Sequence, residues 1–227
     1  MTNKSKGFLG DVNVEAFKLG DSDVKVYLGD MLVYPLNQCG SSGESGGYEY
    51  VDLCLPSGTL WATKNVGASS ETDYGNYYKW GYGADTFQVT SGQSCYSDAV
   101  PDEPLVASAD TAIQTWGGQW HMPTAGQLGE LASNTTFEWT TINGINGGKF
   151  TSQNGNYVFF PAAGYYNHDG TFILDGTTCS IISSIIDGDG RNQILVCSDY
   201  NGGTTDMVGD MYGCEIGLPV RPVIGTF

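Results

Sequence analysis

Length, composition and charge exclude several classes of function. The chain has 227 residues and a net charge of −16, with only nine Lys and Arg side chains. Proteins that bind nucleic acids or anionic membranes need clustered basic residues to neutralise phosphate, so neither partner is expected. Thirty-three Gly, fourteen Tyr, nine Phe and five Trp, against 15% charged residues, are typical of a loop-rich β protein with aromatic packing.

Targeting signals are also missing from the sequence. No run approaches the roughly eighteen apolar residues of a membrane span, and residues 1–7 lack the apolar core of a signal peptide. We therefore expect no membrane insertion. Synthesis in the cytoplasm is expected, unless a leader has been removed.

Residues 1–36 differ in pattern from the rest of the chain. Leu-Gly-Asp recurs at Leu9, Leu19 and Leu28 and separates short alternating apolar runs, which predicts a small β-hairpin module. Its end, Val26-Tyr-Leu-Gly-Asp-Met-Leu-Val-Tyr-Pro35, resembles a short module of bacteriophage tail and tail-fibre proteins. The alternative is an edge hairpin packed on the main domain. So small a hairpin needs a partner surface, from the domain, another subunit or a virion tail protein.

A flexible linker rich in Gly and Ser is predicted over residues 37–47, followed by one domain over residues 48–227. Helices are predicted over residues 109–115 and 124–132, the second with Thr124 as N-cap. Residues 157–160 and 194–196 predict buried strands.

Five phrases in this domain point to one family. They are Leu55-Pro-Ser-Gly-Thr-Leu-Trp-Ala-Thr-Lys-Asn65 within residues 50–68, Tyr74-Gly-Asn-Tyr-Tyr-Lys-Trp-Gly81, Trp116-Gly-Gly-Gln-Trp-His-Met-Pro-Thr124, Phe160-Pro-Ala-Ala-Gly-Tyr165 and Val220-Arg-Pro-Val223. In this order they resemble the Fibrobacter succinogenes major paralogous domain family. The resemblance implies an α+β fold, a loop-rich C-type-lectin-like domain with few short helices. It also implies that Val220-Arg-Pro-Val223 closes the domain by pairing near its N-terminal part.

A search for catalytic residues finds none. His121 and His168 lie in different contexts, and structural roles are favoured for both. The related sulfatase-activating enzymes use cysteines in a context that is missing from this sequence, and no pair of carboxylates has a spacing that singles it out. The chain is therefore not expected to be an enzyme. Most of its six cysteines are expected to be reduced thiols, with one or two disulfides as the alternative.

Calcium is the metal that the resemblance suggests, because many C-type lectins hold sugar through it. Their usual Glu-Pro-Asn, Gln-Pro-Asp and Trp-Asn-Asp signatures do not occur in the sequence. Asp187-Gly-Asp-Gly-Arg-Asn192 offers alternating oxygen ligands but lacks the distal Glu of a calcium loop. A solvated loop is favoured over a calcium site, and no cofactor is expected.

Departures from the family pattern concentrate in residues 179–216. Isoleucines stand at 181 and 182, where relatives usually have an aromatic pair before the double serine Ser183-Ser184, and Cys214 replaces a usual Arg. Some relatives are variable proteins of diversity-generating retroelements, in which randomised adenines yield a broad set of residues. The residues predicted to form such a variable surface are Ile181, Ile182, Ile185, Ile186, Asp187, Asp189, Arg191, Asn192, Asp199, Tyr200, Asn201, Thr204, Thr205, Asp206 and Tyr212.

The four isoleucines leave two interpretations open. They form an exposed apolar patch of the kind that marks a binding site, or they are core residues of a turn-connected strand pair. Under the first interpretation, the polar and tyrosine residues around them supply the rim of an adaptable binding surface.

The function expected from these features is that of a non-catalytic receptor-binding protein of a phage or prophage. Its partner would be a bacterial surface receptor, either glycan or protein, and its location the virion tail. A homo-oligomer is expected through residues 1–36, with a trimer favoured, so that weak single sites act together. The alternative is a lectin-like adhesin of the bacterial cell surface without diversification, and a third possibility is a degenerate enzyme domain.

Overall fold

The computed structural model describes residues 4–9, 12–17, 24–28, 31–36, 41–87, 96, 98–173, 176–210 and 215–226. Side chains are described only for those of these residues that lie within 41–206 or 215–226. The chain divides into two compact units, Met1–Ser41 and Ser42–Phe227. No helix in the described part of the chain is long and apolar enough to cross a membrane.

The first unit contains four strands in an antiparallel meander, β1 (Lys4–Leu9), β2 (Val12–Phe17), β3 (Val24–Leu28) and β4 (Met31–Leu36). The predicted hairpin is the pair β3 and β4, in which Leu28 lies opposite Met31 across a two-residue connection. Two further strands extend this hairpin. The module is therefore larger than a single hairpin.

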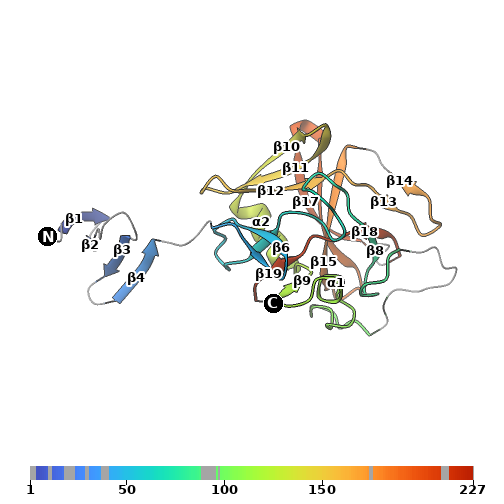
Figure 1. The fold of residues 1–227 in the computed structure, drawn as a ribbon, viewed down its shortest axis with the longest axis horizontal. Helices are drawn as coiled ribbons and strands as arrows, with labels where there is room; N and C mark the ends of the chain where they lie inside the picture. Colours follow the sequence, from blue (N-terminus) through green and yellow to red (C-terminus); the bar gives the residue numbers. More distant parts are fainter. Residues whose placement is uncertain are drawn as a thin grey trace. The chain divides into compact units, whose positions relative to one another are not determined.

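The second unit is mostly β-sheet with few helices, as expected for a loop-rich α+β domain (Figure 1). Four sheets build it, with strand orders β5-β6-β7-β19-β9, β14-β13-β18-β8, β10-β11-β12 and β15-β16-β17. The strands are β5 (Gly43–Ser45), β6 (Tyr48–Asp52), β7 (Leu60–Ala62), β8 (Tyr77–Lys79), β9 (Trp120–His121), β10 (Thr136–Ile142), β11 (Ile145–Thr151), β12 (Tyr157–Pro161), β13 (Tyr165–Tyr166), β14 (Phe172–Ile173), β15 (Thr178–Ile186), β16 (Asn192–Ser198), β17 (Thr204–Asp210), β18 (Gly217–Pro219) and β19 (Val223–Ile224). The helices are α1 (Thr111–Thr115), α2 (Ala125–Asn134) and the short 3-10 helix η1 (Tyr200–Gly202).

Helix α2 confirms the capping signal in the sequence. Thr124 accepts a hydrogen bond from the Gln127 backbone N–H (3.2 Å), and the Gln127 side chain accepts one from the Thr124 N–H (2.8 Å). This reciprocal capping box satisfies two backbone donors that the first turn would otherwise leave unpaired. Leu128 and Leu131 on one face of the helix are fully buried. The other predicted helix is confirmed as α1, which Asp110 caps.

Part of the predicted linker over residues 37–47 is a β-hairpin, and residues 37–40 lie outside the described residues. Residues Gly43–Ser45 form strand β5, which pairs with β6 across a turn at Gly46 and Gly47, both with positive φ. The expectation of a flexible segment up to residue 47 is therefore corrected. Gly46 and Gly47 serve the tight turn, which needs positive φ, and residues 43–47 therefore belong to the hairpin.

Aromatic contacts hold this hairpin against the far edge of its sheet. The Trp120 indole donates to the Ser45 carbonyl (3.0 Å), and Tyr48 stacks on Trp116 with ring centroids 3.9 Å apart. Strands β5 and β9 are the two edges of the five-stranded sheet, which would lie about 19 Å apart if it were flat. The sheet must therefore curl strongly.

The C-terminal phrase closes the domain as expected. Val223 lies opposite Trp61 on β7 and opposite His121 on β9. The buried Arg221 donates to Asn65 (2.9 Å) and to the carbonyls of Ala62 (3.2 Å) and Phe159 (2.9 Å). Burial lowers the pKa of Arg221 to about 9. This side chain ties the five-stranded sheet to β12.

Two hydrophobic cores lie on either side of the β15–β17 sheet. One gathers around Trp61, Phe150 and Phe160, and the other around Trp80, Met122 and Leu218. Cysteine occurs in both expected states, because Cys179 and Cys197 are buried free thiols and Cys54 is disulfide-bonded.

Candidate functional site

The first isoleucine pair of β15 is core, not surface. Ile181 is 2% exposed and belongs to the core around Trp61, whereas Ile182 is 3% exposed and belongs to the core around Trp80. Successive side chains of a strand point to opposite faces, and here both faces are covered. The prediction of an exposed apolar patch is therefore wrong for this pair, and the alternative of a buried strand pair is correct.

The double serine that follows redirects the strand. The pairing of β15 with β16 is irregular between Ile182 and Ile186. There the Ser183 carbonyl accepts from the Trp80 indole (2.9 Å), and the Ser184 N–H donates to the Pro123 carbonyl (2.7 Å). Beyond it, Ile185 and Ile186 are half-buried, and Ile186 packs on the core around Trp80. The second pair is therefore no display patch either.

The turn after β15 uses its carboxylates to hold its own shape. One Asp187 oxygen accepts from the backbone N–H groups of Asp189 and Arg191, both at 2.9 Å. Asp189 is exposed and pairs with the Arg191 guanidinium (3.1 Å). The described residues contain no group of three or more His, Cys, Asp or Glu side chains that could hold a metal ion.

Asn192, predicted as a surface residue, is fully buried at the start of β16. Neither its amide nitrogen nor its amide oxygen meets a hydrogen-bonding partner among the described residues. Its placement on the surface was wrong, because β16 begins at Asn192, two residues earlier than the apolar run 194–196 indicates.

The opposite end of the sheet is exposed. The turn between β16 and β17 carries Asp199, Tyr200 and Asn201, and Tyr200 is 70% exposed. Asn201 adopts a left-handed backbone with φ of +53°. Thr204 and Asp206 are exposed at the start of β17, and Thr205 is half-buried. Tyr212 lies outside the described residues.

The structure therefore divides the predicted site into two groups. Strand β16 spans seven residues and separates the turn at Asp187 from the turn at Asp199 by about 20 Å. The first group is mostly turned away from solvent, with Asp189 as its exposed member. Ile181, Ile182 and Asn192 are buried, and the half-buried members are Ile185, Ile186, Asp187 and Arg191. The group around Tyr200 is displayed.

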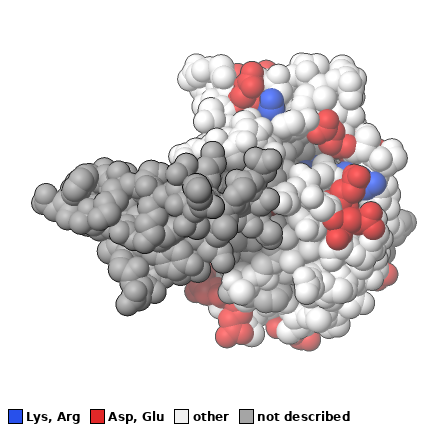
Figure 2. Space-filling model, turned by 60° about the vertical axis from the view of Figure 1, so that its left-hand side comes forward, with Lys and Arg blue, Asp and Glu red and all other residues white. Residues whose placement is uncertain are grey.

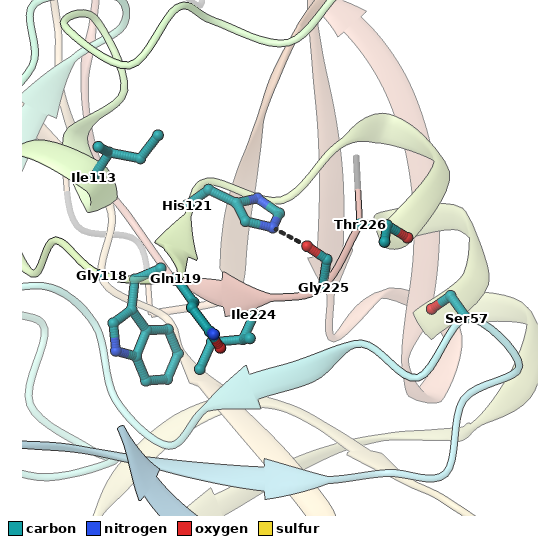
Figure 3. A pocket seen from close by; sticks show the side chains of 9 residues that line it. Ser57, Ile113, Gly118, Gln119, His121, Ile224, Gly225 and Thr226 are labelled. Carbon is teal, nitrogen blue, oxygen red and sulfur yellow. Dashed lines mark hydrogen bonds between the residues drawn. The ribbon is translucent and has the colours of Figure 1, made fainter. Parts of the chain in front are cut away.

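A hollow that the sequence did not indicate lies beside β9 and the C-terminal strand β19. Its volume is about 530 Å³, and Ile113, Trp120, His121 and Ile224 are among its lining residues (Figure 3). The two ring nitrogens of His121 lie 2.8 Å from the Met122 carbonyl and 3.2 Å from the Gly225 carbonyl. A neutral imidazole carries one N–H, so the ring donates to one of these two carbonyls.

Asp110, another titratable group near β9, is also hydrogen-bonded to the backbone. It is fully buried and accepts from the N–H groups of Ile113 (3.0 Å) and Met122 (2.9 Å). Burial raises the pKa of this carboxyl above its ordinary value. Asp110 therefore joins α1 to β9 and positions the walls of the hollow.

The surface charge agrees with the sequence. Figure 2 shows acidic side chains at several places on one face and few basic ones. This distribution disfavours an anionic partner.

Comparison of the chain with protein-family models, with curated proteins and with solved structures found no significant match.

Proposed function

We propose that the chain is a non-catalytic receptor-binding protein of a phage or prophage, a C-type-lectin-like scaffold that displays a retroelement-diversified surface. The display surface is the exposed end of the β16–β17 hairpin: Asp199, Tyr200, Asn201, Thr204 and Asp206. The observation that carries the proposal is the 70% exposure of Tyr200 on a turn that follows β16, a strand whose residues enter both cores.

The composition of the display surface supports binding. Tyrosine supplies a large contact area at low entropic cost, and Asn, Thr and Asp supply adaptable hydrogen bonds, as in antibody loops. A rigid sheet beneath such a turn reduces the ordering cost of binding. Two features of the described residues support a role without catalysis: both nitrogens of His121 face carbonyl oxygens, and both free thiols are buried.

Binding to intact bacteria tests the proposal. A triple variant Asp199→Ala, Tyr200→Ala, Asp206→Ala should lose at least tenfold in binding to a responsive strain, measured by flow cytometry of labelled protein. The control is Asp189→Ala with Arg191→Ala at the opposite end of the sheet, which should bind as the parent does. An equal loss in both variants would contradict a display surface at Tyr200.

Diversification has a separate test. Under the proposal, the gene lies near a reverse transcriptase gene and an adenine-rich template repeat, and sequences from a bacterial population differ at codons 199–206. Identical codons throughout such a population would favour the adhesin without diversification.

Attachment and assembly are assigned to the N-terminal meander. Strand edges in so small a module need a partner, and several copies would present several display surfaces together. Light scattering should therefore show an oligomer, with a trimer favoured, for the full chain and a monomer for a chain that starts at Ser42. An oligomer that survives the truncation would place the interface on the second unit.

A further inference from the structure

A second hollow, of about 260 Å³, lies between edge strand β12 and the β6–β7 hairpin. Val51, Thr63, Glu71, Tyr157 and Phe159 are among its lining residues. Its volume is below the roughly 300–1,000 Å³ of pockets for drug-sized ligands, so it fits an occupant of about one ring. The lining comes from separate segments of the chain, which is why no sequence pattern marks it.

The hollow contains a carboxylate with spare hydrogen-bonding capacity. Among the described side chains, Glu71 forms no ion pair, and its one hydrogen bond comes from the Tyr157 hydroxyl at 3.4 Å. That distance is beyond the usual range for a hydroxyl donor, so a closer donor would be accepted readily. Tyr157 is 37% exposed, and Lys149 lies over its ring at 4.6 Å, which holds the ring in place. An aromatic ring thus stands beside an acceptor at the mouth of the hollow.

Strand β12 adds backbone groups. The Asn156 carbonyl and the Ala162 N–H both form hydrogen bonds toward β11. The backbone N–H and C=O groups of the even-numbered residues between 156 and 162 therefore point toward β11. The Phe159 carbonyl points the other way and accepts from Arg221. By this alternation the backbone groups of Tyr157 and Phe159 point away from β11, on the open edge of the strand.

The walls of the hollow are rigid. Arg221 joins Phe159 on β12 to Ala62 at the end of β7, and it is fully buried. On the other side, the amides of Asn154 and Asn156 both donate to the Asp52 carbonyl, at 3.1 and 2.9 Å. The hollow is therefore formed before any ligand arrives, which lowers the cost of binding.

We propose that this hollow binds one neutral sugar residue, with Glu71 accepting from its hydroxyls and Tyr157 packing against its ring. Sugar hydroxyls both donate and accept, which matches a carboxylate beside backbone N–H and C=O groups. The Glu71 charge disfavours acidic sugars. The site is distinct from the display surface around Tyr200 and does not depend on it.

Saturation-transfer NMR and calorimetry on the full chain test the proposal with glucose, galactose and N-acetylglucosamine. At least one should bind with a Kd of about 1 mM, which corresponds to about −4.1 kcal/mol. Glucuronic acid should bind at least tenfold more weakly than glucose. Failure of all three neutral sugars at high millimolar concentration would overturn the proposal.

Variants locate the site. Glu71→Gln preserves shape and should weaken sugar binding at least tenfold, and Tyr157→Ala should do the same. Glu138→Gln, on an exposed position of β10 at the far edge of that sheet, should bind within twofold of the parent. The Asp199, Tyr200, Asp206 triple variant should also bind sugar normally, which separates this site from the proposed function. Unchanged thermal melts show that each variant is folded.

Two outcomes would identify a different ligand for the hollow and would overturn the proposal. Binding of glucosamine or free lysine without neutral sugars would make Glu71 an ammonium site. Binding of an extended peptide that protects the N–H of Phe159 from exchange, without sugar binding, would make the edge of β12 a strand-addition site.

Discussion

Strand β15 contains two identical Ile-Ile pairs, one on each side of Ser183 and Ser184. The first pair lies where β15 is regularly paired with β16, and its side chains enter two different cores. Between the two pairs, Ser184 bonds to Pro123 and Leu105 instead of β16, and beyond this irregularity Ile186 pairs with Asn192. The same dipeptide is therefore fully buried in one place and half-buried in the other, because the partners of the strand, not its residues, decide burial.

The two turns of the same sheet differ in a similar way. In the turn at Asp187, a carboxylate accepts two backbone N–H groups and defines the loop. In the turn at Asp199, three successive residues have positive φ: Asn201 at +53°, Gly202 at +87° and Gly203 at +110°. Among the described residues, the Tyr200 side chain in this turn makes no comparable contact, and Tyr200 is 70% exposed.

The largest expected effect comes from the first isoleucine pair. Ile181→Ala and Ile182→Ala should each lower the free energy of unfolding by about 2–5 kcal/mol, because each leaves a cavity in a closed core. Ile185→Ala should cost less than half as much. Urea denaturation measures all three. Equal losses would mean that the irregularity at the double serine does not separate core from surface.

The acidic turn should show the next largest effect. Asp187→Ala leaves two backbone N–H groups without their acceptor and should cost about 1–3 kcal/mol. Asp189→Ala removes only an exposed ion pair and should change stability by about 0.5 kcal/mol or less. Thermal melts compare the two. A large cost at Asp189 would point to a structural role that its exposed ion pair does not explain.

Within the displayed turn, the backbone should matter more than the tyrosine. Gly203→Ala places a methyl at a positive φ and 3.2 Å from the Trp139 Cβ, so it should cost about 1 kcal/mol or more. Tyr200→Ala should cost about 0.5 kcal/mol or less. Differential scanning calorimetry measures the stability of both variants. The reverse order would show that Tyr200 is a packing residue.

The smallest effect concerns an exposed loop outside the sheet. Hydrogen bonds from the Ser69 backbone N–H and hydroxyl and from the Gly75 N–H lower the pKa of Asp73 below 3.8. A carboxyl with a lowered folded pKa contributes stability above its unfolded pKa and loses it as the pH falls through the folded value. Asp73→Asn should therefore make the decline in stability below pH 3.8 slightly shallower than in the parent. Acid-unfolding curves by circular dichroism test this, and parallel curves would contradict it.

The sequence alone determined the elements whose signals are local. Thr124 as N-cap predicted α2, since a cap and the first turn that it bonds lie within a few residues of each other. The apolar run at residues 157–160 predicted β12. The phrase Val220-Arg-Pro-Val223 predicted the closing strand, although its pairing with β7 came from the family resemblance and not from periodicity.

Tertiary structure decided where the isoleucines lie and which predicted site residues are displayed. A strand buried on both faces reads as a continuous apolar run, so neither a period of 2 nor a period of 3.6 could separate surface from core at Ile181 and Ile182. The separation of the two turns by the length of β16 depends on strand direction, and the hollow at Glu71 and Tyr157 depends on the approach of β12 to β6 and β7. Such contacts join residues far apart in the chain, and no local pattern records them.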